Sequence, residues 1–96
     1  YQERRMNYSL LYKKLIDFSK HCGKSTLKNE LWVGKIDKRW TVTINGHNND
    51  EHNIPPFGCR VRYDSSIVAL ITADGGAILG NMYEDELIKA IDKAII

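Results

Sequence analysis

The spacing of apolar residues changes twice along the chain, and this limits the possible folds more than any other feature. Between residues 7 and 22 the apolar side chains recur every three or four positions, which is typical of an amphipathic helix. Across residues 39–45 and 59–64 apolar and polar residues alternate, as in strands with one buried face. Helical spacing returns near the carboxyl end. A chain of 96 residues in this order is long enough for one domain.

The first predicted helix has signals at both ends. Asn7 can cap its start, and Gly23 stands where a left-handed residue ends a helix. Lys13 and Lys14 lie opposite the apolar stripe and give the helix a basic outer face.

Five strands are predicted between the helices. They cover residues 31–36, 39–45, 59–63, 67–72 and 77–80. The first two form a hairpin across Asp37-Lys38, and Trp40, Val42 and Ile44 mark the apolar face of the second, leaving its other face wet. Residues 67–72 are apolar on both faces, which favours a central strand at least partly covered on each side.

A second helix is predicted after the strands. Asn81 can cap it, Glu84 follows three residues later, and Leu87 and Ile91 belong to its buried stripe. The expected architecture is an α+β two-layer sandwich. A mainly antiparallel sheet of about five strands carries an N-terminal and a C-terminal helix on one face, in the order α-β-β-β-β-β-α.

The cellular compartment is predicted from the lack of a membrane-spanning run and of a signal-like start. We find neither an apolar run of about 18 residues nor a signal-like start, so a soluble intracellular (cytoplasmic) protein without membrane contact is expected. Residues 1–5 are expected to be a disordered or non-native leader, and residues 6–96 the domain. Cys22 and Cys59 match no metal spacing and are expected to be buried free thiols.

The stretch from His47 to Pro56 is predicted to be a long loop with candidate ligands. His47, Asp50, Glu51 and His52 could bind zinc or nickel, but the loop has no helical HExxH register and no cysteine pair. We therefore assign no metal, cofactor or catalytic residue. Long loops are frequent contact surfaces, so these four residues stay candidates for binding a macromolecule.

Charge is unevenly distributed along the chain. Residues 1–46 carry 10 basic and 4 acidic side chains, whereas residues 47–96 carry 4 basic and 8 acidic ones. In the predicted sheet, arginines and threonines share the face turned away from the helices, where arginine can bind anionic groups. Trp32 is a possible aromatic anchor for a partner. The candidate set comprises Lys13, Lys14, Trp32, Lys35, Lys38, Arg39, Arg60 and Arg62 together with the loop residues.

These patterns favour a binding role. No nucleophile elbow, phosphate loop or acid–base pair is present, and no family motif can be placed residue by residue. The leading hypothesis is a small non-enzymatic module that binds a protein as a regulator or inhibitor, a class that includes virus-encoded proteins. The alternatives are nucleic-acid binding through the basic first helix and hairpin, and a small enzyme or metal site at His47 and His52. Either a monomer or a homodimer joined at a sheet edge is expected.

Overall fold

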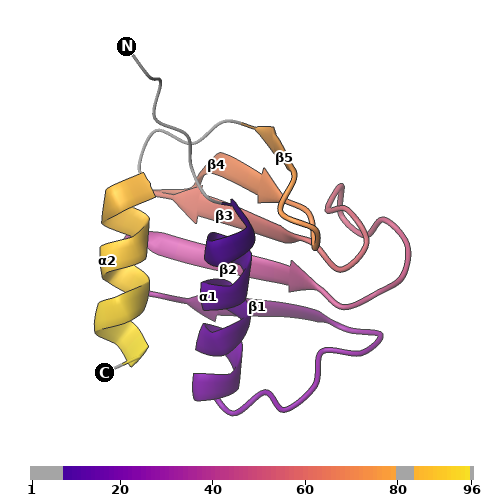
Figure 1. Cartoon of the computed structure of the whole chain (residues 1–96), viewed down its shortest axis with the longest axis horizontal. Helices are drawn as coiled ribbons and strands as arrows, with labels where there is room; N and C mark the ends of the chain where they lie inside the picture. The colour runs from indigo at the N-terminus through magenta and orange to yellow at the C-terminus, as the bar shows by residue number, and fades with distance from the viewer. Residues whose placement is uncertain (1–7, 80–83, 96) are drawn as a thin grey trace.

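The computed structural model of the chain describes residues 8–79 and 84–95. Their elements follow in the order α1 (Tyr8–His21), β1 (Leu31–Lys35), β2 (Trp40–Asn45), β3 (Cys59–Tyr63), β4 (Ser66–Ile71), β5 (Ala77–Leu79) and α2 (Glu84–Ile95) (Figure 1). The α+β class predicted from the change of period is confirmed. Some predicted features lie outside the described residues. They are the leader at residues 1–5, the helix caps at Asn7 and Asn81, and the end of the last strand at Gly80.

The strands form one antiparallel meander. They lie in the order β1-β2-β3-β4-β5, so each strand pairs with its neighbours in the sequence. Four strands of five or six residues make up most of the sheet, and the predicted fifth strand is reduced to a three-residue pairing of β5 with β4. Strand β1 forms one edge of the sheet.

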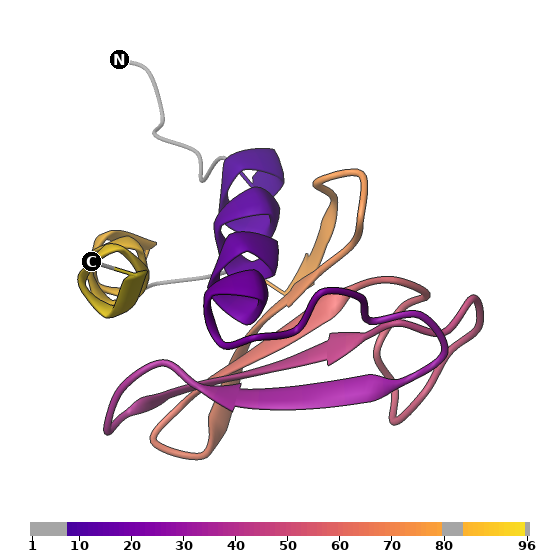
Figure 2. The same ribbon diagram turned by 90° about the horizontal axis from the view of Figure 1, so that it is seen from below.

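Both helices lie on the same side of the sheet, and neither of these described helices covers the other side (Figure 2). An ion pair joins the helices, because Lys14 Nζ lies 2.6 Å from Asp92 Oδ1. The core combines both helices with alternate strand residues: Leu11, Leu15, Phe18, Leu87 and Ile91 pack with Trp40, Val42, Ile44, Cys59, Val61, Ala69 and Ile71. Burying each large aliphatic side chain contributes about 1.5–3 kcal/mol, so this covered face is where apolar burial stabilises the fold.

The end of α1 is a Schellman motif around Gly23. The Gly23 amide donates to the Lys20 carbonyl, and the Lys24 amide donates to the Ser19 carbonyl. Gly23 adopts a φ of 94°, which a residue with a Cβ rarely takes. The predicted stop is confirmed. Among the described residues, neither helix is long and apolar enough to cross a membrane.

Two predictions about burial are wrong, and a third is met only in part. Thr43 and Asn45, expected on a wet face, are both buried, because neighbouring strands and a loop cover them. Cys22, expected in the core, is exposed beyond the last turn of α1, whereas Cys59 is buried as predicted. The helices cover one face of strand β4, and on its other face Leu70 is half-buried and Ile67 is 43% exposed, so the predicted cover on both faces is found only in part.

Candidate functional site

The sheet face without helices, here called the open face, carries two cross-strand rows of side chains. The strand register places Val33, Thr43, Arg60 and Leu70 in one row, and Lys35, Thr41, Arg62 and Ile67 in the other. In both rows threonine and arginine occupy the middle and an aliphatic residue stands on β4. Opposed side chains on one face are direct neighbours, so the rows form a continuous surface.

Aliphatic side chains at two sides of the open face are exposed. Val33 on β1 is 62% exposed, and Ile67 on β4 is 43% exposed. A register shift between Val61 and Arg62 brings Ile67 opposite Arg62. A β-bulge of this kind changes the direction of a side chain and leaves little trace in the sequence, so the apolar part of this surface was missed.

Arg60 and Arg62 form the centre of the open face. Arg60 Nη1 donates to the His52 carbonyl at 3.1 Å, and Arg62 Nη1 donates to the Ser65 carbonyl at 3.1 Å. Within residues 8–79 and 84–95, neither guanidinium forms an ion pair with a carboxylate. The buried Arg60 Nε has no acceptor among the same residues. Burial, together with the positive charge of Arg62, lowers the pKa of Arg60.

One end of the open face is a shallow depression with a basic lining. It lies where β1 ends and β2 begins, and is lined by Val33, Lys35, Lys38, Arg39, Thr41, Asp64 and Ser65. The structure thus brings together three residues predicted as binding residues. With the adjacent Arg62, we call Lys35, Lys38 and Arg39 the basic corner.

Within the basic corner Arg39 is held in place. Its Nη1 donates to the Tyr63 hydroxyl at 2.7 Å, and its guanidinium carbon lies 5.8 Å from the centre of the Tyr63 ring. The hydrogen bond to Tyr63 raises the pKa of Arg39. The two nearby carboxylates are Asp64 and Asp37, and Asp37 already accepts the backbone amides of Arg39 and Trp40. Four cations therefore outnumber two carboxylates here, which favours an anionic ligand.

The loop between β2 and β3 lies at the opposite end of the sheet from the basic corner (Figure 1). Asn45 organises the loop: its amide nitrogen donates to the carbonyls of Asn49, Ile54 and Pro55, and its Oδ1 accepts the His47 amide. In the part of the chain that the structure describes, no three His, Cys, Asp or Glu side chains are grouped so as to hold a metal ion.

Hydrogen bonds of the backbone carbonyl groups position two of the four candidate residues in this loop. His47 is half-buried, and its carbonyl accepts the Phe57 amide. His52 is exposed in a left-handed conformation, and its carbonyl accepts Arg60. Asp50 is exposed and Glu51 half-buried. This loop borders the open face through His52 only, by the contacts found among the described residues.

Three predicted binding residues lie on the helix side of the molecule. Lys14 is paired with Asp92, and Lys13 is exposed on α1. Trp32 is opposite Ile44 in the register, so its ring points toward the helices and lies 6.0 Å from that of Phe18. It therefore does not stand beside Arg60 and Arg62 as an aromatic anchor.

The open face is thus a mixed surface. It has aliphatic side chains on both sides of a pair of arginines, and the basic corner lies at one end. Such a surface can bind carboxylates or phosphates by charge-assisted hydrogen bonds and bury apolar groups beside them. Comparison of the chain with protein-family models, with curated proteins and with solved structures found no match.

Proposed function

We propose that the protein is a non-enzymatic binding module whose open face and basic corner take up an acidic, partly apolar surface of another protein. The observation that carries this proposal is the pair Arg60 and Arg62. Two like charges stand side by side on β3, one of them partly desolvated and with an unpaired Nε among the described residues.

This arrangement lowers the free energy of unfolding of the domain on its own. Like charges on neighbouring side chains of one sheet face repel each other, and a buried donor without an acceptor costs about 1–3 kcal/mol. A carboxylate from a partner relieves the repulsion, because it accepts hydrogen bonds from the guanidinium Nη groups and neutralises charge. The basic corner adds attraction over a longer range, which speeds the encounter with an acidic partner.

The exposed aliphatic residues favour a protein over a nucleic acid. Val33 and Ile67 stand in the same two rows as the arginines, and their exposed area gains free energy when a partner covers it. A phosphate backbone offers charge and no comparable apolar surface, so nucleic-acid binding would leave these residues in water. Nucleic-acid binding at the basic corner is the second candidate, supported by Lys35, Lys38 and Arg39.

The test compares two charge reversals of equal size on opposite sides of the molecule. The variant Arg60→Glu/Arg62→Glu alters the open face, and Lys13→Glu/Lys20→Glu alters exposed positions of α1. Each protein is immobilised, exposed to nuclease-treated cell lysate at low salt, and analysed by quantitative mass spectrometry. Circular dichroism checks that both variants are folded.

We expect the wild type and the α1 variant to retain the same acidic proteins and the open-face variant to lose them at least about tenfold, equivalent to about 1.4 kcal/mol. Equal recovery by the two variants, or no partner of the wild type at low salt, would contradict the proposal. A gel-shift titration at about 50 mM salt tests the second candidate, since phosphate contacts weaken steeply with salt. Binding of nucleic acid that depends on the basic corner, without protein recovery, would favour that candidate.

A further inference from the structure

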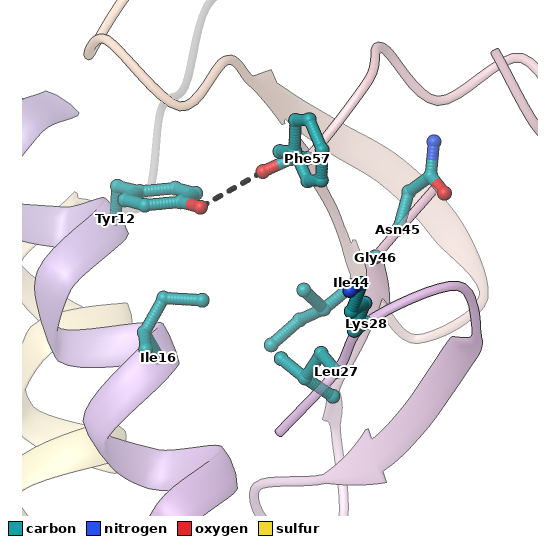
Figure 3. Close-up of a pocket in the computed structure, with 8 residues that line it drawn as sticks. All are labelled: Tyr12, Ile16, Leu27, Lys28, Ile44, Asn45, Gly46 and Phe57. Atoms are coloured by element: carbon teal, nitrogen blue, oxygen red, sulfur yellow. Dashed lines mark hydrogen bonds between the residues drawn. The ribbon is translucent and has the colours of Figure 1, made fainter. Parts of the chain in front are cut away.

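An apolar pocket lies on the helix side of the sheet, at the opposite end from the basic corner. It has a volume of about 240 Å³ and is lined by α1, by the segment before β1, by the end of β2 and by the loop before β3 (Figure 3). The apolar side chains around it are those of Tyr12, Ile16, Leu27, Ile44 and Phe57, and Lys28, Asn45 and Gly46 complete the lining. We propose that this pocket binds an uncharged aromatic compound of one or two rings.

Hydrogen bonds fix the elements that line the pocket relative to one another. The Tyr12 hydroxyl donates to the Phe57 carbonyl at 2.9 Å and so joins α1 to the loop (Figure 3). The Gly46 amide donates to the Glu30 carbonyl at 2.7 Å, and the Gly46 carbonyl accepts the Asn29 amide at 2.9 Å. A Cβ at Gly46 would overlap the Leu27 carbonyl, so the two backbones are in direct contact. The pocket is thus formed before any ligand arrives.

Two of the three polar side chains that line the pocket, Tyr12 and Asn45, are already hydrogen-bonded, and the third is that of Lys28. The hydroxyl of Tyr12 is bonded to the loop, and burial raises the pKa of Tyr12, which keeps the phenol neutral. The amide of Asn45 points away from the pocket and into the loop (Figure 3). An ordered water needs two to four polar partners, so these walls favour an apolar occupant.

Phe57 places an exposed aromatic ring at the rim of the pocket. Its backbone adopts a φ of 57° as the third residue of a turn, which the Gly58 amide closes by donating to the Pro55 carbonyl, and its ring is 46% exposed. The core gains little from a ring in that position. At the rim of the pocket, however, the ring can cover a bound aromatic group, and aromatic pairs are favourable beyond the area they bury.

The size of the pocket limits the ligand. An apolar cavity of about 150 Å³ holds benzene, and drug-sized ligands occupy pockets of about 300–1,000 Å³. A pocket of about 240 Å³ therefore suits one ring or two fused rings. Indole has this size and is a suitable probe, and imidazole is a small polar ring that the lining should not retain.

The experiment is a titration of the ¹⁵N-labelled full chain with indole, followed by amide chemical shifts. We expect saturable shifts at Ile16, Leu27, Gly46 and Phe57, and none with imidazole. Ile16→Phe fills the pocket and should weaken indole binding at least about tenfold. Ile67→Phe makes the same change on the open face and should leave binding unchanged.

Phe57→Ala provides a second variant, because its exposed ring can be removed without opening the core, and it too should weaken binding. Absence of saturable shifts in the wild type, or unchanged indole affinity in folded Ile16→Phe, would overturn the proposal. The pocket and the open face lie on opposite sides of the sheet, so either result leaves the proposed protein-binding role to its own test.

Discussion

The two faces of the sheet are built from alternate residues of the same strands, yet they differ in burial and in the kinds of side chain they carry. On the covered face Val42, Val61 and Ile71 are fully buried, and their identities are explained by packing alone. On the open face arginines stand between threonines and exposed aliphatic residues, and no packing argument requires this combination. The comparison separates residues that stabilise the fold from residues available for binding.

Strand β4 allows the sharpest comparison, because it carries an isoleucine on each face. Ile71 is 0% exposed and Ile67 is 43% exposed. We expect Ile71→Ala to lower the free energy of unfolding by about 2–5 kcal/mol, since it leaves a cavity in the core. Ile67→Ala should cost less than about 1 kcal/mol. Urea denaturation measures both, and similar losses at the two positions would show that the open face is also packed.

Asn45 marks the limit of the open face. By alternation it belongs with Thr41 and Thr43, but the β2–β3 loop folds over it and it is fully buried. Asn45→Ala leaves several loop carbonyls without their donor, and we expect a loss of about 1–3 kcal/mol. Hydrogen exchange should speed up in residues 47–57 and stay unchanged in α1. Asn48→Ala, at an exposed position, is the control.

Cys59 tests the covered face through pH. Burial raises the pKa of the Cys59 thiol to about 12, from an ordinary value of 9.0. Above pH 9 the unfolded chain loses this proton and the folded chain keeps it, so stability should fall by up to about 1.4 kcal/mol per pH unit. The clearest window is pH 9 to 10, since Tyr12 has a raised pKa and adds a similar effect above 10.0.

Denaturant titrations at pH 7, 9 and 10 measure this slope. The variant Cys59→Ala should lose it, and Cys22→Ala should keep it, because Cys22 is exposed. An Ellman assay on the folded protein should find one reactive thiol. Rapid reaction of both thiols would mean that the covered face opens readily.

Much of the covered face could be predicted from the sequence. The strict alternation of Trp40, Val42 and Ile44 identified their buried side, and the spacing in α1 identified Leu11 and Leu15, because local periodicity alone decides which residues share a face. The hairpin turn at Asp37 followed from the same pattern, and Asp37 accepts two backbone amides there.

The candidate site was harder to predict, because it depends on contacts between distant segments. Burial of Asn45 requires the loop to fold back over it, and the position of Ile67 depends on the register shift beside Arg62. Trp32 lies over Gly34, where a Cβ would clash with its ring, so the tryptophan covers its own strand toward the core side. The positions of Asn45 and Ile67 have no local signature, whereas Trp32 and Gly34 are two residues apart on one face of β1.

The proposed binding role requires that the arginines of the open face contribute little to stability. The most direct measurement is the free energy of unfolding of Arg60→Met by urea denaturation, because methionine keeps an apolar stem over the sheet and removes the charge. The variant loses one hydrogen bond to His52 and is relieved of the repulsion by Arg62. The variant also removes the unpaired buried Nε, so we predict a free energy of unfolding equal to that of the wild type or up to about 2 kcal/mol higher. A loss of more than about 1.5 kcal/mol would show that Arg60 is a structural residue and would contradict the account.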